Sequence, residues 1–461
     1  MSRETFDLIV IGGGAGGVPA AIRAAQLGGR VAVIEQGHLG GLCMNKGCIP
    51  FGHMMAASHI LGSLSLAGEM GIHCSQVNKD YPRLIERQTE LIAFMRQGVK
   101  GMFKKHKIQS VKGRGKLEGP GAVSVDGKVL SAPKIILAGG GKWLDPVFPG
   151  SDLKEVSNSD DLLKAKKLPG KCLVYGDGPF IIQIAQFLQR FGCDTTLVTT
   201  QRSLLSNESK AIRTRLKKVL SKEGIHMLMD TRIVSVEKKK SDLHCLLQKG
   251  GKEETKVVER VIVLNRGGAL EGLGLDTVGL DETAEFIAVD DHMRTTAEGI
   301  YAIGDVAAPE TNHYSHSATA GGIVAAENAM GSNARFDSRS VPRVCFTRPQ
   351  VACIGFTKKA AKKAGYDVMT GSAPLSMNPF GMLTSQNEGI VEIISEKKYG
   401  EILGIHILGD GACEMAGQAV LAIQMEMTLE ELARAQFPHP TLSESLPEAA
   451  RDALGWPIYL P

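Results

Sequence analysis

Two cysteines carry the clearest chemical signal in the chain. Cys43 and Cys48 lie in the run Gly40–Pro50, with four residues between them. Two thiols at this spacing can form a redox-active disulfide or serve as zinc ligands. A closed zinc site needs four ligands, and no second Cys/His pair with finger-like spacing follows in the sequence. We therefore interpret the pair as a redox-active disulfide and predict no metal site.

A dinucleotide-binding unit precedes the cysteines. The apolar run 8–11 predicts a strand, residues 18–27 predict a helix, and residues 30–34 predict a second strand that ends in Glu35. A G-x-G-x-x-G motif between the first strand and the helix comprises Gly12, Gly14 and Gly17. Such glycines permit a tight turn and a close approach of the backbone to a pyrophosphate, and an acid at the position of Glu35 holds a ribose 2′-hydroxyl. The order of these features predicts a bound dinucleotide.

With these features the sequence resembles, from end to end, the pyridine nucleotide-disulfide oxidoreductases, and most closely their dihydrolipoamide dehydrogenase branch. Three further segments carry the resemblance, namely residues 138–140, 296–307 and 439–444. Gly139 stands where the family usually has a threonine, and Gly304 and Asp305 match a second FAD motif whose aspartate holds the ribityl chain. In the family, the first nucleotide unit binds FAD, the disulfide lies against the flavin, and a second nucleotide unit binds NAD or NADP.

The resemblance implies a role for each catalytic residue. Cys43 would exchange with a dithiol substrate, and Cys48 would lie against the flavin. Exchange needs a thiolate, and an ordinary thiol of pKa about 8.5 is only a few per cent ionised at pH 7. His439 would therefore act as the base, with the Glu444 carboxylate orienting its imidazole and favouring the protonated form. The resemblance also implies a homodimer, because in the family this histidine reaches the disulfide of the other subunit.

Length and resemblance together predict the domain organisation. A chain of 461 residues is too long for one hydrophobic core. We expect an α/β fold with two Rossmann-like dinucleotide-binding domains, for FAD and NAD(P), and a C-terminal α+β dimerisation domain. The expected bounds are 1–148 and 270–340 for the FAD-binding domain, 149–269 for the NAD(P)-binding domain and 341–461 for the dimerisation domain. Within the first domain we expect a long helix at about 81–107 and a hairpin around Asp126-Gly127.

Composition argues against several other classes. The formal charge of +4 is small, and the lysine clusters at 104–105, 166–167 and 238–240 lack interleaved aromatic residues, so we expect no nucleic-acid partner. No run of about 18 apolar residues occurs, and the N-terminus leads directly into the first strand, which predicts neither a membrane span nor a secretory signal. Nine scattered cysteines argue against a structural disulfide framework. We therefore expect a cytoplasmic protein whose other cysteines are packing residues.

The sequence departs from the family at a charged pair. After the second cysteine the family usually reads C-I-P-S-K, whereas this chain has Phe51 and Gly52 after Pro50. The glutamate that pairs with the missing lysine is also absent, because Gln183 stands at its position. Losing both members leaves neither charge buried alone, whereas a single loss would cost several kcal/mol. We expect the fold to tolerate this change and the catalysis to differ.

The second nucleotide motif is weaker than the first. It contains Gly176 and Gly178, but Ile181 stands where a small third residue is needed for helix–strand packing. Asp177 is expected to add a negative charge near the pyrophosphate, and the strand at 195–198 ends without an acid for the NAD ribose. These departures predict slow or weak turnover of NAD(H) relative to the dithiol half-reaction.

We therefore expect an FAD-dependent enzyme that oxidises a dihydrolipoyl dithiol, on a carrier protein or as a small molecule, with NAD as acceptor. NADP, a quinone or an electron-carrier protein are alternative acceptors, and Arg202 would meet the 2′-phosphate of NADP. A flavin-bound interaction protein without turnover is a further hypothesis, which the intact catalytic residues oppose. Mercuric reductases usually carry a C-terminal cysteine pair that residues 455–461 lack, and residues 411–415 favour the lipoamide branch over glutathione reductase.

Overall fold

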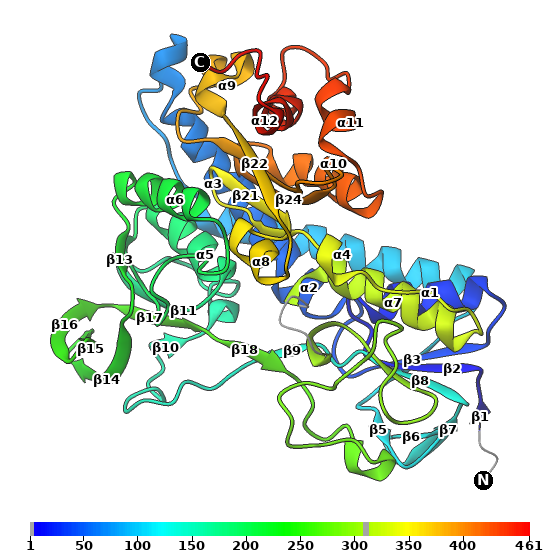
Figure 1. Cartoon of the computed structure of the whole chain (residues 1–461). Coiled ribbons are helices and arrows are strands. Elements are labelled where there is room, and N and C mark those ends of the chain that lie inside the picture. Colours follow the sequence, from blue (N-terminus) through cyan, green and yellow to red (C-terminus); the bar gives the residue numbers. More distant parts are fainter. Residues whose placement is uncertain (1–3, 308–312) are drawn as a thin grey trace. The chain divides into compact units, whose positions relative to one another are not determined.

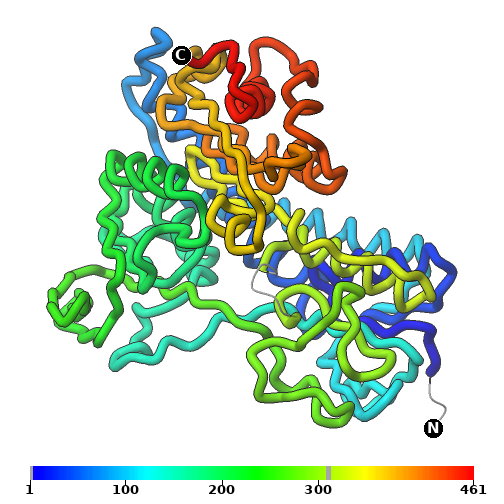
Figure 2. The backbone as a smooth tube through the Cα atoms, viewed as in Figure 1, coloured from blue at the N-terminus to red at the C-terminus, as the bar shows by residue number. Residues whose placement is uncertain are grey.

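The computed structural model describes residues 4–307 and 313–461 of the chain. The chain divides into two compact units, each assembled from three separate segments that can be followed along the tube in Figure 2. Unit 1 comprises residues 1–53, 82–144 and 265–338, and unit 2 comprises residues 54–81, 145–264 and 339–461. The chain thus leaves unit 1 after Leu144 and returns to it at Asn265.

Unit 1 is built on a five-stranded parallel sheet of order β19-β8-β2-β3-β4. Its strands are β2 (Leu8–Ile11), β3 (Val31–Glu35), β4 (Gln109–Lys112), β8 (Lys134–Leu137) and β19 (Ile300–Ala302). The central strand β2 is buried on both faces, which is why it reads as an uninterrupted apolar run. Leu8 and Val10 pack toward the helices, whereas Ile9 and Ile11 pack toward the second sheet of the unit.

Helices cover one face of this sheet and an antiparallel sheet covers the other (Figure 1). The helices are α1 (Gly17–Gln26), α4 (Tyr81–Lys105) and α7 (Ser315–Ala329). The second sheet is antiparallel across β7 (Lys128–Ser131), β6 (Ala122–Val125) and β5 (Lys116–Leu117), and β1 (Glu4–Thr5) adds to β7 in parallel. Asp126 and Gly127, both with positive φ, form the two-residue turn between β6 and β7, which confirms the predicted hairpin. The long helix predicted at 81–107 is α4.

Two consecutive helices carry the cysteine pair. They are α2 (Gly41–Lys46) and α3 (Cys48–Leu64), separated only by Gly47. In the same unit, β9 (Gly141–Trp143) pairs with β18 (Arg266–Gly268) as a two-stranded antiparallel ribbon. The short 3₁₀ helices of unit 1 are η3 (Leu275–Val278), η4 (Gly304–Val306) and η6 (Ser338–Ser340).

Unit 2 contains a second parallel sheet, of order β10-β17-β11-β12-β13. Its strands are β10 (Val156–Ser157), β11 (Lys171–Gly176), β12 (Asp194–Val198), β13 (His226–Leu228) and β17 (Arg260–Leu264). The accompanying helices are α5 (Pro179–Arg190) and α6 (Lys210–Lys222). An antiparallel meander adds β14 (Arg232–Lys239), β15 (Asp242–Lys249) and β16 (Lys252–Val258).

The C-terminal part of unit 2 is an antiparallel sheet of order β20-β21-β24-β23-β22. Its strands are β20 (Arg343–Cys345), β21 (Gln350–Gly355), β22 (Val368–Pro374), β23 (Ile390–Glu396) and β24 (Ile402–Gly409). The helices of this part are α8 (Lys358–Lys363), α9 (Pro379–Leu383), α10 (Ala412–Gln424), α11 (Leu429–Arg434) and α12 (Ser445–Leu454). The remaining 3₁₀ helices of unit 2 are η1 (Ala67–Met70), η2 (Ser159–Asp161), η7 (Leu375–Met377) and η8 (Leu442–Glu444).

The central strand β24 is buried along its whole length, and one of its faces packs in a core with α10, α11 and α12. Among the described helices, none is long and apolar enough to cross a membrane.

Candidate active site

A cavity of about 560 Å³ in unit 1 brings together most of the predicted FAD residues. Its lining includes Gly12, Gly14, Glu35, Cys43, Gly139, Gly304 and Asp305. The parallel strands explain this convergence, because the glycine loop follows β2, Glu35 ends β3 and the turn at Gly139 follows β8. Loops at the carboxyl ends of neighbouring parallel strands lie at one edge of the sheet, where ligands of such folds bind.

The glycine loop has the geometry that FAD needs. Gly12 has φ +108°, and a Cβ there would lie 2.1 Å from the carbonyl oxygen of Ala138. A Cβ at Gly17 would lie 1.9 Å from the carbonyl oxygen of Gly12, so both positions require glycine. Helix α1 begins here without a side-chain cap, which leaves backbone N–H groups and the positive end of the helix dipole for a pyrophosphate.

Glu35 is fixed by two backbone donors. The N–H of Gly13 donates to its Oε2 at 2.8 Å, and the N–H of Gly37 donates to its Oε1 at 2.5 Å. A carboxylate has about four lone-pair sites, so each oxygen retains a site for a ribose hydroxyl. The residues of this cavity therefore fit the adenosine and pyrophosphate of FAD.

Asp305 has an ion-pair partner that the sequence did not reveal. The guanidinium of Arg266 pairs with its carboxylate, whose side chain is only 8% exposed. A Cβ at Gly141 would lie 2.5 Å from Asp305 Oδ2 and 2.6 Å from Arg266 Nε, so β9 can pass this ion pair only with glycine at that position. The role of Asp305 toward the ribityl chain stays a prediction.

The cysteine pair is asymmetric in its protonation. Cys43 lies in α2 and Cys48 begins α3, and the hydrogen bond between the two sulfurs lowers the pKa of the Cys48 thiol to about 6, against the opposing effect of burial. Ser315 and the positive charge of Arg266 act in the same direction on Cys48. The same sulfur–sulfur hydrogen bond, burial and repulsion from the Cys48 charge raise the pKa of Cys43. These directions favour Cys48 as the thiolate of the reduced pair and Cys43 as the thiol.

Ser315 is a site residue that the sequence analysis missed. Its Oγ lies 3.0 Å from the Sγ of Cys48, although 267 positions separate the two residues. Ser315 is the first residue of α7, a helix of 15 residues, so the positive end of the helix dipole also lies beside the Cys48 sulfur. Its position ten residues after Asp305 was the only available signal, and the resemblance assigned no role to it.

The predicted base and its carboxylate partner lie together in unit 2. His439 Nδ1 is 2.9 Å from Glu444 Oε1, and the N–H of Thr441 donates to Glu444 Oε2 at 2.9 Å. The 3₁₀ turn η8 thus fixes the carboxylate that orients the imidazole. The His439 side chain is 62% exposed, so its Nε2 edge is available to a group outside this chain.

In the second glycine loop, two threonine hydroxyls hold Asp177, the residue that we expect to add a negative charge near the pyrophosphate. Its carboxylate accepts hydrogen bonds from the hydroxyls of Thr199 and Thr200, the latter at 3.0 Å. These threonines follow β12, where the family has an acid for the NAD ribose. The strand end therefore does have a carboxylate beside it, supplied by the loop instead of by the strand.

The other departures are also accommodated locally. Gly176 and Gly178 have φ of +147° and +86° and flank the start of α5. Ile181 is fully buried, at 1% exposure, and Gln183 donates from Nε2 to the carbonyl of Pro179 at 3.3 Å. Helix α5 therefore accommodates the isoleucine at position 181, where we expected a small residue to be needed for helix–strand packing. Arg202 is exposed in the bend after β12.

Gly52 on α3 lies in open surroundings. A Cβ there would meet no described atom within 4 Å. Gly52, which replaces the family lysine, therefore has space around it for a larger side chain among the described residues.

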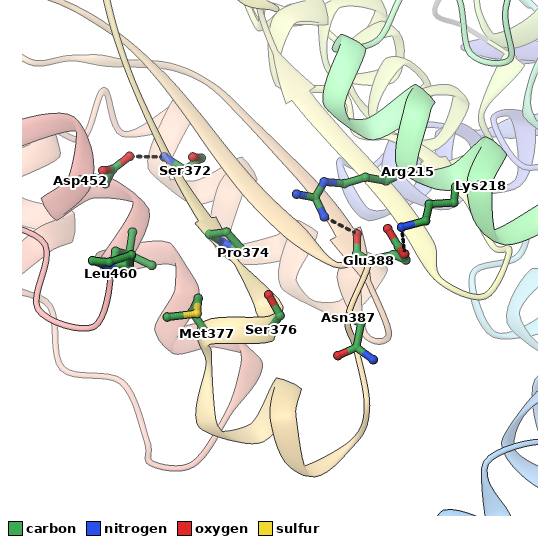
Figure 3. A pocket seen from close by; sticks show the side chains of 11 residues that line it. Arg215, Lys218, Ser372, Pro374, Ser376, Met377, Asn387, Glu388, Asp452 and Leu460 are labelled. Carbon is green, nitrogen blue, oxygen red and sulfur yellow. Dashed lines mark hydrogen bonds and ion pairs between the residues drawn. The ribbon is translucent and has the colours of Figure 1, made fainter.

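A second cavity, of about 640 Å³, lies in unit 2 (Figure 3). Lys218 Nζ forms an ion pair with Glu388 at 2.5 Å at one end, and Asp452 accepts a hydrogen bond from the N–H of Ser372 at 2.7 Å at the other. The described residues that line it include none of the predicted site residues. We therefore do not assign the predicted chemistry to this cavity.

Comparison with known proteins agrees with this geometry. The model of the pyridine nucleotide-disulphide oxidoreductase family matches residues 6–331, and the model of the dimerisation domain of that family matches residues 341–450. The chain therefore belongs to the pyridine nucleotide-disulphide oxidoreductase family. The match to the dimerisation domain supports the predicted homodimer.

Similar proteins extend over the whole chain. A dihydrolipoyl dehydrogenase of Thermus scotoductus is 36% identical, with 97% of each chain covered. A dihydrolipoyl dehydrogenase of Bacillus subtilis is 30% identical over 98% of this chain and 100% of its own. The crystal structure of LpdA from Mycobacterium tuberculosis shares the fold, with a TM-score of 0.88 at 24% identity over 96% of this chain and 99% of its own. The structural match confirms the predicted fold class. The family and the relatives confirm that the chain is an oxidoreductase that uses FAD and NAD.

Proposed function

We propose that this protein oxidises a protein-bound or small dihydrolipoyl dithiol through a Cys43–Cys48 disulfide, with FAD as the electron relay and NAD as the acceptor. The observation that carries the proposal is the asymmetry of the cysteine pair: the Ser315 hydroxyl lies 3.0 Å from the sulfur of Cys48, whose pKa is lowered, whereas the pKa of Cys43 is raised. The similarity to proteins named dihydrolipoyl dehydrogenase supports the choice of substrate.

The asymmetry determines which sulfur the substrate attacks. In thiol–disulfide exchange, the thiol of lower pKa is the better leaving group. A substrate thiolate therefore attacks the Cys43 sulfur and releases Cys48 as a thiolate, which Ser315 and Arg266 stabilise. The second substrate thiol then loses its proton to solvent and attacks the substrate sulfur of the mixed disulfide, and Cys43 leaves and takes up the first proton. The substrate dithiol is oxidised to a disulfide, and the enzyme disulfide is reduced to the Cys43 thiol and the Cys48 thiolate.

A base must remove the substrate proton before the first attack. The imidazole that Glu444 orients is suited to this role, because a neutral Nε2 can accept the proton and the carboxylate stabilises the resulting imidazolium. In the proposed homodimer, His439 of the partner subunit performs this step. The imidazolium then returns the proton to the Cys43 sulfur as that group leaves.

FAD, when bound, accepts the electron pair of the dithiol and passes it on as a hydride equivalent. We assign the pyrophosphate to the first glycine loop, the adenosine ribose to Glu35 and the ribityl chain to Asp305. Gly41 belongs to this arrangement because a Cβ there would lie 2.6 Å from the Cα of Gly14. The helix that carries Cys43 therefore packs directly on the cofactor loop.

We assign NAD to the loop that contains Gly176 and Gly178, with the Asp177 carboxylate as the acceptor for the ribose. Thr199 and Thr200 occupy one lone-pair site on each oxygen, which leaves others for the ribose hydroxyls. A carboxylate at this position also repels a 2′-phosphate, so NAD is favoured over NADP. The exposed Arg202 is the residue that would serve NADP if the acceptor were the phosphorylated form.

One observation favours a second candidate, a disulfide flavoenzyme with a quinone or a protein as acceptor. Neither Gly52 nor Gln183 carries the charge that the family has at these positions, so the nicotinamide side of the site is altered. In either case we place the enzyme in the cytoplasm.

Anaerobic reduction of the enzyme-bound flavin distinguishes these candidates. The oxidised holoenzyme is mixed in separate stopped-flow experiments with dihydrolipoamide, NADH and NADPH, and flavin absorbance is followed. Fast reduction by dihydrolipoamide together with measurable reduction by NADH is expected. Failure of dihydrolipoamide to reduce the flavin would refute the proposed substrate, and reduction by dihydrolipoamide but not by either nucleotide would favour the second candidate.

A further inference from the structure

A row of polar residues crosses the antiparallel sheet of unit 2, outside the proposed active site. Arg343 pairs with Cys353, Cys353 with His406 and His406 with Glu392 across the strands β20, β21, β24 and β23. Directly opposed residues of neighbouring strands place their side chains on the same face of a sheet. This row faces Glu208, which lies just before α6 and forms an ion pair with Arg343 at 2.7 Å.

His406 has a free nitrogen aimed into this cluster. The residue is fully buried, at 0% exposure, and its Nε2 lies 3.0 Å from the carbonyl oxygen of Phe356. A carbonyl only accepts, so Nε2 carries the hydrogen and Nδ1 presents a lone pair. Nδ1 has no hydrogen-bond partner among the described residues, and it lies 3.7 Å from Glu208 Oε2. The Nδ1 lone pair and the Glu208 carboxylate oxygen are therefore two acceptors that face each other across this gap.

The arrangement of His406 is the one that metal-binding histidines use. Such residues donate one ring N–H to a carbonyl or carboxylate, which fixes the tautomer and leaves the other nitrogen for the metal. The ligand atoms of Glu208, Cys353 and His406 all lie within 4.8 Å of one another, and Cys353 is buried. Adjacent ligands of a tetrahedral zinc ion are about 3.3–3.8 Å apart, given metal–ligand bonds of about 2.0–2.3 Å, so modest movement would close the site.

Charge balance also favours a divalent cation. The side chain of Glu208 is 8% exposed, and its two oxygens accept from Arg343 at 2.7 and 3.0 Å. Glu392, the neighbour of His406 in the row, is fixed by the hydroxyl of Ser209. Two carboxylates thus face the single positive charge of Arg343, which gives these groups a net charge of −1. A divalent ion that displaces the proton of Cys353 adds one net positive charge and so neutralises the cluster.

We propose that Glu208, Cys353 and His406 bind a zinc ion, with a water molecule or Glu392 as the fourth ligand. A thiolate, an imidazole and a carboxylate suit Zn²⁺ better than Mg²⁺ or Ca²⁺, which prefer oxygen ligands. On binding, the Cys353 thiol releases its proton to solvent, and bonds form from Sγ, Nδ1 and a Glu208 oxygen to the metal. All three ligands are held by the sheet or by the turn before α6, so the ion joins the nucleotide-binding part of unit 2 to its C-terminal sheet.

The site is structural by this inference and is independent of the proposed activity. Cys353 and His406 are directly opposed in paired strands and both are fully buried, and the Glu208 side chain is only 8% exposed, so the site offers little access to a substrate. The sequence analysis predicted no metal site because the three ligands are 53 to 198 positions apart in the chain and form no spacing motif.

Metal content and X-ray absorption test the inference. The FAD-loaded enzyme is produced in zinc-supplemented medium, its cysteine pair is oxidised so that Cys43 and Cys48 cannot bind metal, and loosely bound ions are removed on a chelating resin. We expect about one zinc per chain, with one Zn–S distance of about 2.3 Å and Zn–N/O distances of about 2.0–2.2 Å. Absence of retained zinc, or zinc without a sulfur ligand, would overturn the proposal.

Matched variants identify the ligands. Cys353→Ala should lose the sulfur contribution and most of the zinc, whereas Cys345→Ala, which removes a buried thiol from the neighbouring strand β20, should retain both. Zinc bound through sulfur in the Cys353→Ala variant would also overturn the proposal. If Cys353→Ala does not fold, the zinc content and X-ray absorption spectrum of the wild-type enzyme are sufficient to test the proposal.

Discussion

The hydroxyl of Ser315 lies 3.0 Å from the sulfur of Cys48, at the first residue of helix α7. A hydroxyl donor stabilises a thiolate and not a thiol, so this contact favours the charged form of Cys48. Ser315 is therefore a positioning residue for the reduced enzyme. Its effect should be visible in the acid–base behaviour of the cysteine pair.

We predict that Ser315→Ala raises the pKa of Cys48. A hydrogen bond to a charged group contributes about 1.5–3 kcal/mol, or about one to two pKa units. In the two-electron-reduced wild-type enzyme, the thiolate–flavin charge-transfer absorption should persist above about pH 6 and disappear as the pH falls through that value. A pH titration of this band measures the shift. Ser315→Thr retains the hydroxyl and should behave like the wild type, whereas an unshifted titration in Ser315→Ala would contradict the assigned role.

The two cysteines should differ in single substitutions. Cys48→Ser should abolish the long-wavelength charge-transfer band, because it removes the ionised sulfur. Cys43→Ser should retain the band and show it without any reductant, because Cys48 is then a free thiol whose ionised form Ser315 and Arg266 still favour. Absorption spectra of the FAD-loaded variants at pH 8 test both statements. A reduced wild-type enzyme that shows only bleached flavin would rule out Cys48 as the flavin-side thiolate.

Removal of the base should slow one half-reaction selectively. His439→Gln is expected to slow flavin reduction by dihydrolipoamide about 10²–10⁴-fold, the usual contribution of general acid–base catalysis, while FAD stays bound. Glu444→Gln should have a smaller effect in the same direction, because it removes only the group that orients the imidazole. Reduction by NADH serves as the control and should change far less in both variants.

A site shared between subunits predicts complementation. Mixing the His439→Gln and Cys43→Ser variants and allowing subunit exchange should restore part of the dithiol activity, because one of the two composite sites in each heterodimer is then intact. The measurement is steady-state activity after exchange, with the heterodimer fraction verified by mass spectrometry. Verified heterodimers without recovered activity would contradict a shared site.

The nucleotide loop gives a prediction about cofactor choice. Asp177→Asn should weaken NADH binding about 10–150-fold, the range expected for a lost charge-assisted hydrogen bond, and should narrow the preference for NADH over NADPH because a repulsive charge is removed. Titration of binding with both nucleotides tests this, and Arg202→Ala provides a matched surface control for the NADH affinity. Unchanged NADH affinity in Asp177→Asn would mean that its carboxylate serves only Thr199 and Thr200.

The sequence predicted the parts of the fold that local patterns encode. The strand before Gly12, the acid at Glu35 and the hairpin at Asp126 each depend on a short run of residues, and the structure places them as expected. The comparisons then confirmed the family that the ordered motifs had indicated. Local patterns were sufficient because each motif includes both the turn and the strand that supports it.

Contacts between distant segments were not predictable in the same way. Ser315 meets Cys48 across 267 positions, and Asp177 accepts hydrogen bonds from threonines 22 and 23 positions later. Only the relative placement of the sheet, α3 and α7 determines the first contact. The direction of a single side chain in a glycine loop determines the second, and spacing in the sequence contains no information about that direction.

The close packing of Gly41 on Gly14 has a consequence for how this sequence can vary. Gly41 has φ +57°, and a Cβ there would lie 2.6 Å from the Cα of Gly14. The cofactor loop and the helix that carries Cys43 are therefore in backbone contact, with no space for a side chain between them. Among natural variants, an alanine at position 41 should therefore be absent unless the loop around position 14 has also changed its path. This steric limit applies to position 41 alone. Other positions of α2 can therefore change, and with them the surroundings of the cysteine pair, while the contact between α2 and the cofactor loop is kept.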